Sequence, residues 1–362
     1  MAKVTDVAQY ISLKFTETRR EGRVSVPTAG MGGIKLNANE NPYGCSPRVL
    51  AALANYHDLN YYPDVQEIRK LLAGYAGVGE EYVVPASGGS GILDLVAHLF
   101  VGAGDEVISC PPTFGLFTMR AQLYGGILVS VPRDGNFAVN VAEVKAAITP
   151  KTKVIVLVNP NNPTGTLTPR EDILAILDTG LPVLLDEAYA EFSGLTLTSY
   201  VSQYQNLMLV RTLSKWAGLA GVRIGFGIFS PKVAEYIGRI TLPFHVSRAA
   251  LVAIQESMKD LDYLMGNVKL IIAERERLIS ELGRLKFLKP YPSSGNYVCC
   301  SVLSGDAQEM QKELARKGVQ INAIDIGKGG VNALRMTVGK PEHSDALLGI
   351  LRDYAAAKQL PL

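Results

Sequence analysis

The chain has 362 residues, of which 48% are hydrophobic and 19% are charged, and its formal net charge is +2. This composition is typical of a globular protein with one large domain and a smaller one. The near-neutral charge gives no electrostatic reason to expect nucleic acid or an anionic membrane as partner, and no apolar run reaches the about 18 residues that a membrane helix needs.

The first residues and the cysteines bear on the compartment. Residues 1–15 interrupt their apolar positions with Asp6 and Gln9, so they do not read as a secretory signal. The four cysteines, of which Cys299 and Cys300 are adjacent, show neither a zinc spacing nor a disulfide framework. The four histidines are scattered, so we expect no metal site. These features favour a reducing cytoplasm.

Short apolar runs alternate with helical patterns in the first two thirds of the chain. The predicted strands are continuously apolar, which indicates strands covered on both faces, and they cover residues 104–109, 153–158, 182–189, 206–212 and 221–229. Helices are predicted at residues 140–148 and 169–177, the second with Thr168 as N-cap and Pro169 as first helical residue. The alternation predicts an α/β layer fold.

The pattern changes after Leu261, where apolar residues recur at helical spacing along a charged segment. These residues are Leu264, Val268, Ile271, Leu278 and Leu282, and Gly283 is suited to end the helix. Strands are predicted at residues 294–302 and 332–339, followed by a helix that starts near Ser344. We therefore predict a second, α+β domain, with the boundary near residues 250–265.

Two glycine-containing motifs are candidates for binding an anion. The small residues 87–91 precede an apolar helical stretch, where backbone N–H groups and the helix dipole favour an anion, although glycine and serine also simply begin helices. Residues 102–107 match part of a dinucleotide fingerprint. That motif leads into a strand instead of following one, so we discount a nicotinamide cofactor.

Polar side chains follow two of the predicted strands. Asp186 and Tyr189 close the run at residues 182–189, and Asn162 lies in the asparagine- and proline-rich segment 158–165. In α/β proteins the carboxyl ends of strands are where ligands bind. The alternatives are an acid that caps the next helix and a plain strand-to-helix turn.

The segment 211–227 contains Lys215, directly after Ser214 and ahead of Arg223. Ser214 and Arg223 can both contact a phosphate, and each hydrogen bond to a charged group contributes about 1.5–3 kcal/mol. A partly desolvated lysine has a lowered pKa and is a nucleophile toward carbonyls, and Asp186 can keep a pyridine nitrogen protonated. Lysine, acid, asparagine, tyrosine and a phosphate cradle together indicate pyridoxal 5'-phosphate.

On these motifs the sequence resembles the pyridoxal-phosphate aminotransferases of fold type I, and among them the histidinol-phosphate aminotransferases. The resemblance covers nearly the whole chain after residue 30, and its motifs occur in the order KLNANENPYG, YYPD, NPNNPTG, DEAYAEF, RTLSKWAGLAGVRIGFG and LRMTVG. It implies a large domain with a mostly parallel central sheet flanked by helices, plus a smaller α+β domain. We predict an N-terminal arm at residues 1–35, a cofactor-binding domain at 36–255 and a small domain at 256–362.

The resemblance also implies roles for single residues. Lys215 carries the cofactor and moves the proton of the substrate's Cα, Asp186 pairs with the pyridinium nitrogen, and Tyr189 and Asn162 hold the 3'-oxygen of the ring. The other implied cofactor contacts are Gly89, Ser90, Phe114, Ser214, Arg223 and, from the neighbouring subunit, Tyr62. The implied substrate-binding residues are Arg335, Asn39, Tyr43 and Asn322. The alternatives are interface packing for Tyr62 and an ordinary ion pair for Arg335.

The implied function is amino-group transfer between L-histidinol phosphate and 2-oxoglutarate in histidine biosynthesis, by a homodimer with shared active sites. The sequence departs from the family at four places. Gly91 and Ile92 replace an acidic pair, Phe114 replaces a frequent tyrosine, and Asn322 replaces a frequent substrate-binding arginine. The usual N-terminal Pro-Tyr segment is not evident, and Lys14, Arg19 and Arg20 are candidates to compensate for it.

Three alternatives stay open at this point. Asn322 favours an aminotransferase for aromatic or other amino acids, and a decarboxylase of a phosphorylated amino acid would use the same cofactor. A non-enzymatic regulator that binds pyridoxal phosphate is disfavoured, because Lys215 is intact.

Overall fold

The fold is known from a computed structural model that describes residues 33–327 and 329–361. The predicted compensating residues Lys14, Arg19 and Arg20 lie outside the described residues, as does most of the predicted N-terminal arm. Among the described residues, no helix combines the length and the apolar character that crossing a membrane would require.

A seven-stranded mixed sheet forms the centre of the large part of the molecule, in the order β2-β8-β7-β6-β5-β3-β4. Its strands are β2 (Val83–Ala86), β3 (Glu106–Ser109), β4 (Ile127–Ser130), β5 (Thr152–Val158), β6 (Val183–Asp186), β7 (Leu207–Thr212) and β8 (Gly225–Ile228). The five strands from β4 to β7 are parallel, and only β8 runs antiparallel to β7 and to β2. The predicted mostly parallel sheet is therefore confirmed.

Helices cover both faces of this sheet, which explains the continuous apolar runs. They are α2 (Pro47–Ala54), α3 (Val65–Ala76), α4 (Gly88–Phe100), α5 (Leu116–Leu123), α6 (Val141–Ala146), α7 (Arg170–Leu177), α8 (Ala190–Ser193), α9 (Pro231–Ile240) and α10 (Arg248–Met258). Side chains along a strand alternate between the two faces. Leu184 and Met208 accordingly pack in the cluster under α4, and Leu185 and Leu209 in the larger cluster on the opposite face.

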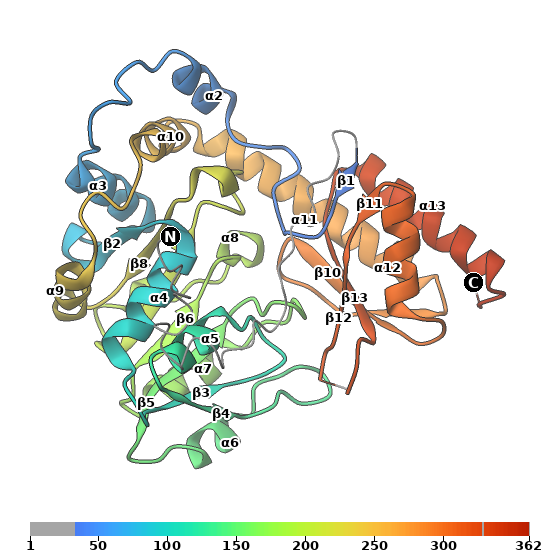
Figure 1. The fold of residues 1–362 in the computed structure, drawn as a ribbon, viewed down its shortest axis with the longest axis horizontal. Helices are drawn as coiled ribbons and strands as arrows, with labels where there is room; N and C mark the ends of the chain where they lie inside the picture. Colours follow the sequence, from blue (N-terminus) through green and yellow to red (C-terminus); the bar gives the residue numbers. More distant parts are fainter. Residues whose placement is uncertain (1–32, 328, 362) are drawn as a thin grey trace, which may run out of the picture.

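A smaller antiparallel sheet, in the order β12-β13-β10-β9, belongs to the C-terminal part. Its strands are β9 (Leu288–Pro290), β10 (Tyr297–Val302), β12 (Asn322–Ile324) and β13 (Ala333–Thr337), and its helices are α11 (Leu261–Gly283), α12 (Ala307–Arg316) and α13 (Pro341–Ala357). Strand β1 (Ile34–Lys35) pairs with β11 (Val319–Gln320), so the first described segment joins this part, as Figure 1 shows. The exact domain boundaries stay a prediction.

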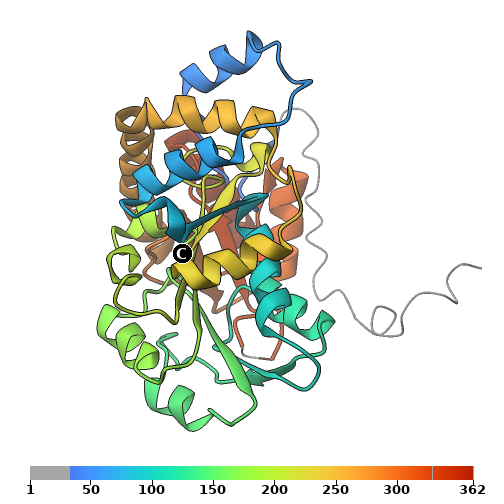
Figure 2. The same cartoon turned by 90° about the vertical axis from the view of Figure 1, so that its left-hand side faces the viewer.

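Helix α2 stands out from the body in both views of the molecule (Figure 1, Figure 2). It packs on α10, and the chain then returns through residues 55–64 to α3. This projecting region carries Tyr62, the residue that the resemblance places at a neighbouring subunit.

Three local predictions are wrong in their starting residues. The N-cap of α7 is Pro169, because its carbonyl accepts the first helical bond from the N–H of Ile173 at 3.2 Å, whereas the carbonyl of Thr168 accepts from Asn159 Nδ2 at 3.4 Å. Strand β8 starts only at Gly225, since Arg223 has φ +60°, which interrupts an extended run. Helix α13 starts at Pro341 and not near Ser344, with proline at the first helical position.

Candidate active site

Asp186 is the last residue of β6, at the carboxyl edge of the central sheet. Its carboxylate is buried and accepts a hydrogen bond from the N–H of Ala188 at 3.0 Å. Burial raises the pKa of Asp186 to about 6, although the Ala188 N–H and the positive charge of Lys215 lower it. A buried carboxylate at this place is suited to hold a positively charged ring nitrogen.

Lys215 follows the end of β7, in the loop before the 3-10 turn η4 (Ala220–Val222). Its Nζ donates to the carbonyl oxygen of Ala38 at 3.0 Å and lies 5.9 Å from the ring centroid of Tyr189. Burial, followed by the charge of Arg335, lowers the pKa of Lys215 to about 8, and Asp186 is among the groups that oppose this shift. A neutral amine is therefore accessible near physiological pH, within the field of Asp186.

Tyr189 lies at the start of α8, near Lys215. Its hydroxyl accepts a hydrogen bond from Asn39 Nδ2 at 2.9 Å, which leaves the proton of that hydroxyl free to be donated. Burial raises the pKa of Tyr189 to about 12, so the phenol stays protonated. Asn39 is itself buried, and its Oδ1 accepts from Thr337 Oγ1 at 3.2 Å. Both ends of the Asn39 amide are thus engaged within the protein.

Arg335 reaches the site from β13 of the smaller sheet. Its Nη1 donates to Asn162 Oδ1 at 2.8 Å and its Nη2 to the carbonyl oxygen of Asn37 at 2.7 Å. Asn322, its register partner on β12, donates to the same Asn37 oxygen at 2.6 Å. Among the described residues no carboxylate lies within salt-bridge distance of Arg335, which speaks against the ordinary ion pair. Its uncompensated charge favours an anionic ligand.

The start of α4, the end of β7 and the start of β8 meet in a cradle of small and hydroxylated residues. Arg223 Nη2 donates to Ser90 Oγ at 3.3 Å, and Ser214 Oγ accepts from Thr212 Oγ1 at 3.0 Å. Glycine is required at two positions here. Gly88 has φ +75°, which favours glycine, and a Cβ on Gly225 would lie 2.3 Å from the backbone nitrogen of Gly89. Ser87, the N-cap of α4, makes no side-chain capping bond, so the N–H groups of Gly89 and Ser90 are suited to an anion.

Three predicted residues lie farther out. Phe114 lies in the loop between β3 and α5 and is 39% exposed. Tyr62 is 70% exposed and stacks on Phe244 with ring centroids 3.8 Å apart. Tyr43 has Lys340 Nζ 5.5 Å from its ring centroid, and burial together with Glu274 and Glu342 raises its pKa. The structure gives none of these three a direct contact with Lys215 or Arg335, so their roles stay predictions.

The segment of residues 37–39 contributes more than the sequence indicates. The carbonyl oxygen of Asn37 holds Arg335, that of Ala38 holds Lys215, and the side chain of Asn39 holds Tyr189. Two of these contacts use backbone atoms, which every residue type carries, so side-chain chemistry could not point to them. The only signal in the sequence is that the segment lies inside the motif KLNANENPYG.

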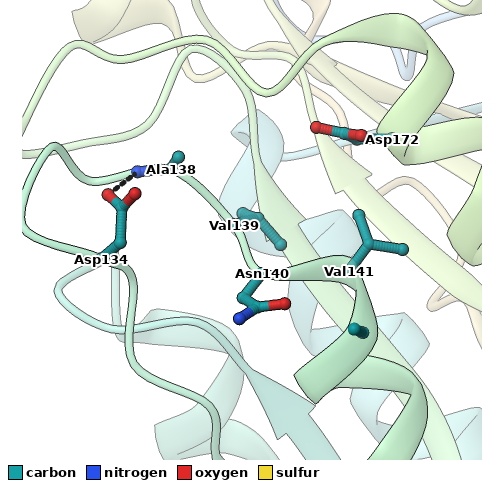
Figure 3. Close-up of a pocket in the computed structure, with 7 residues that line it drawn as sticks. Asp134, Ala138, Val139, Asn140, Val141 and Asp172 are labelled. Carbon is teal, nitrogen blue, oxygen red and sulfur yellow. Dashed lines mark hydrogen bonds between the residues drawn. The ribbon is translucent and has the colours of Figure 1, made fainter.

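A cavity of about 360 Å³ lies apart from this site, beside α6 and α7 (Figure 3). Its lining includes Asp134, whose carboxylate accepts from the N–H of Ala138 at 2.8 Å, and Asp172. It contains no cationic side chain, so it does not suit a phosphate. Within the part of the chain that the structure describes, no group of His, Cys, Asp and Glu side chains could hold a metal ion.

The raised pKa of Asp186 predicts how the stability of the cofactor-free protein depends on pH. Between its ordinary value of 3.8 and about 6, the folded state holds a proton that the unfolded state has lost, so this contribution to stability is lost as pH rises through 6. Two pKa units correspond to about 3 kcal/mol. The Asp186→Asn variant should therefore gain in unfolding free energy relative to wild type by up to this amount from about pH 4 to 7. Urea unfolding of both proteins across this pH range measures the difference in unfolding free energy. A difference that does not change with pH would contradict the prediction.

Comparison with known proteins gives the family of the chain. The family "Aminotransferase class I and II" matches residues 32–351. A histidinol-phosphate aminotransferase of Dehalococcoides mccartyi is 47% identical over 88% of this chain and 89% of its own length. The chloroplastic histidinol-phosphate aminotransferase 1 of Arabidopsis thaliana is 39% identical over 89% of this chain and 78% of its own.

Among solved structures, the fold is similar to that of histidinol-phosphate aminotransferase from Sinorhizobium meliloti in complex with pyridoxal-5'-phosphate. The TM-score is 0.81 at 24% identity, covering 98% of this chain and 99% of that one. At this identity the likeness supports the fold alone. The family match and the identities of the relatives show that the chain belongs to the class I and II aminotransferases.

Proposed function

We propose that this aminotransferase transfers an amino group between L-histidinol phosphate and 2-oxoglutarate, with pyridoxal 5'-phosphate as its cofactor. The observation that carries the proposal is the amine of Lys215, whose pKa burial and then the charge of Arg335 lower to about 8, in the field of the Asp186 carboxylate. The names of relatives up to 47% identical support histidinol phosphate as the amino donor.

The residues present fit the cofactor. Its phosphate would meet the cradle of Gly89, Ser90, Ser214 and Arg223, where the donors are hydroxyls, backbone N–H groups and one guanidinium. Asp186 would hold the ring nitrogen. The 3'-oxygen would meet Tyr189 and Asn162, and Phe114 would cover a face of the ring. When bound, pyridoxal phosphate supplies an electron sink for the negative charge that develops at the substrate's Cα.

The Nζ atom of Lys215 would move the proton of the substrate's Cα. As a neutral amine, its Nζ leaves the carbonyl of Ala38 and takes the proton from the Cα of the amino donor. In the second half-reaction, the ammonium form of Nζ gives a proton to the corresponding carbon of the oxo acid. Tyr189 keeps its hydroxyl proton, because its pKa of about 12 lies far above neutral pH, and so serves as a hydrogen-bond donor and not as a base.

Arg335 would bind the anionic end of each substrate in turn. Its guanidinium is held by Asn162 and by the Asn37 carbonyl, and this arrangement fixes the planar fork that a carboxylate or phosphate requires. Asn322 turns its amide to the same carbonyl and carries no charge, so it adds no second cation.

The experiment that tests the substrate is a panel of amino donors with 2-oxoglutarate as acceptor. We expect histidinol phosphate to give the highest kcat/KM, at least about tenfold above phenylalanine and tyrosine, because its phosphate offers Arg335 more negative charge and more acceptor oxygens than their single carboxylate does. A higher kcat/KM for the aromatic amino acids would replace the proposed donor. Release of carbon dioxide without amino transfer would instead identify a decarboxylase.

We also propose that the protein acts as a homodimer that buries the projecting region near α2. Large apolar side chains gather there and are exposed in the single chain: Leu59, Tyr61, Tyr62, Leu242 and Phe244. An apolar group of this kind on a single chain is typical of an interaction surface. Tyr62 would then reach the cofactor phosphate of the other subunit.

The four free cysteines agree with a cytoplasmic location, which cell fractionation would test.

Replacing Phe244 by glutamate should dissociate this dimer and lower activity, because a charge would be buried against an apolar partner surface. Sedimentation velocity should show the mass of one 39.0 kDa chain for this variant and twice that for wild type. Leu303→Glu is the matched control, since Leu303 is 59% exposed but lies after β10 in the smaller sheet. A wild-type monomer with full activity would contradict the proposal.

A further inference from the structure

A buried ionic network lies directly behind the candidate site. We call it the Arg211 network, and its members are Arg211, Glu187, Glu191, Tyr75 and Thr196. Arg211 Nη2 donates to Glu191 Oε1 at 2.7 Å, and Arg211 Nη1 lies 3.4 Å from Glu187 Oε2. The hydroxyl of Tyr75 donates to Glu191 Oε1 at 2.8 Å, and that of Thr196 to Glu187 Oε2 at 2.6 Å. Arg211 and both glutamates are at least nine-tenths buried.

The network and the site both take residues from the ends of β6 and β7, but their side chains lie on opposite faces of the sheet. On β6 and its extension, Asp186 and Glu187 are consecutive, and on β7 so are Arg211 and Thr212. Consecutive side chains of an extended strand point to opposite faces. Thr212 bonds Ser214 in the phosphate cradle, whereas Arg211 bonds the two glutamates. The network therefore contacts the backbone that carries the site without entering the site.

The network joins the segments that bear two of the proposed catalytic residues. Glu187 and Glu191 flank Tyr189, two residues away on either side. Arg211 precedes Lys215 by four residues on the same strand and loop. One guanidinium thus ties the turn that presents Tyr189 to the strand that leads to Lys215. The main chain also joins them, through the pairing of β6 with β7 and through the bond from the N–H of Glu187 to the carbonyl of Val210 at 2.9 Å.

Stability alone gives a poor reason for this arrangement. Two carboxylates surround one guanidinium in a buried place, and burial raises the pKa of Glu187. Among the described residues, Glu191 Oε2 and Arg211 Nε are buried and have no hydrogen-bond partner. Such buried pairs contribute little net stability, because desolvation offsets their attraction. What they do provide is a fixed geometry, since the planar guanidinium sets the direction of each bond.

We propose that Arg211, Glu187 and Glu191 are positioning residues, which hold Tyr189 and Lys215 at the separation that the reaction requires. This inference rests on the proposed function. The three residues would touch neither substrate nor cofactor. They would act by holding the backbone at the ends of β6 and β7, which carries Tyr189 and Lys215. Errors of about 1 Å in the placement of reacting groups can cost about 100-fold in rate, so a loss of this geometry should appear in kcat.

The chain contains a built-in reporter of this geometry. Trp216 is the single tryptophan, is fully buried and directly follows Lys215. Its ring stacks on that of Tyr75, with centroids 4.9 Å apart and planes at 10°. Tyr75 in turn bonds Glu191. A change in the network should therefore alter the fluorescence of Trp216, even in the cofactor-free protein.

The test uses Arg211→Lys, which keeps the charge but loses the planar fork, and Tyr75→Phe, which removes one hydroxyl and keeps the stack. For Arg211→Lys we expect kcat to fall about 10- to 100-fold with KM within about threefold of wild type. The pH midpoint of the bound cofactor's absorbance should move by at least about 0.5 unit. Tyr75→Phe should change kcat and the absorbance midpoint in the same direction as Arg211→Lys, but by smaller amounts. Both variants should change the Trp216 emission of the cofactor-free protein.

Arg277→Lys is the matched control. Arg277 makes a two-pronged bond to the buried Glu274 at 2.9 Å and 2.9 Å, within α11 and away from the strand ends of the site. Because the Arg277 side chain is 39% exposed, we expect a smaller loss of stability in urea, while kcat, the absorbance midpoint and Trp216 emission stay at wild-type values. The proposal is overturned if the control loses as much kcat, or if Arg211→Lys keeps the wild-type kcat and midpoint. If Arg211→Lys does not fold, Tyr75→Phe decides by the same criteria. Failure of the proposed function would show differently, as a wild-type protein with neither cofactor absorbance nor turnover.

Discussion

Replacing Lys215 by alanine should lower kcat by at least about 10⁴-fold, which exceeds any other single change in this protein. The side chain would supply both the amine that carries the cofactor and the base that moves the Cα proton. Its Nζ is the group whose pKa burial and Arg335 lower to about 8. Single-turnover measurements with histidinol phosphate would separate this loss from any change in binding.

A control variant and a rescue experiment test whether the loss is due to the amine of Lys215. Lys232→Ala removes an exposed lysine on α9 and should leave kcat unchanged. Added methylamine should restore part of the activity of Lys215→Ala, because a small amine fits the space of the missing side chain and can take up the proton. Activity of Lys215→Ala within about tenfold of wild type would show that another group is the base.

The second large effect is expected for Asp186→Asn, which keeps the shape of the side chain and removes its charge. We expect kcat to fall by about 10²- to 10³-fold, as for the loss of one preorganised electrostatic partner. The carboxylate is buried and bonded to a single N–H, that of Ala188, so most of its charge is available to a bound ring nitrogen. The absorbance of the bound cofactor, titrated against pH, would show whether that nitrogen stays protonated.

Asp178→Asn is the matched control, since Asp178 is an exposed aspartate that accepts a hydrogen bond from the Tyr204 hydroxyl at 3.1 Å. It should leave both kcat and the absorbance titration as in wild type. If Asp186→Asn kept wild-type activity, Asp186 would be a structural acid at the strand end, which is the alternative that the sequence leaves open.

Five of the seven strands of the large sheet could be predicted, because burial on both faces leaves an apolar run. The predictions missed β2 and β4, and most residues of β4 are exposed. Each of the five runs contains a strand of the central sheet, from β3 to β8. The errors lie at the ends of elements, where a single backbone contact decides. Thr168 has the right side chain for an N-cap, but its carbonyl oxygen accepts a hydrogen bond from Asn159 Nδ2 at 3.4 Å instead of the first helical bond. Such a competing bond cannot be read from the residue type.

The amino-acid sequence by itself determined which residue types are offered to the candidate site, because Lys215, Asp186, Tyr189 and the cradle residues stand in an ordered set of motifs. Only the tertiary structure decided what holds them. The carbonyls of Asn37 and Ala38 and the guanidinium of Arg211 act through position, and their partners lie far away in the chain or across a strand. The physical reason is that side-chain chemistry is local to a residue, whereas burial, pKa and direction of a bond depend on neighbours that folding brings together.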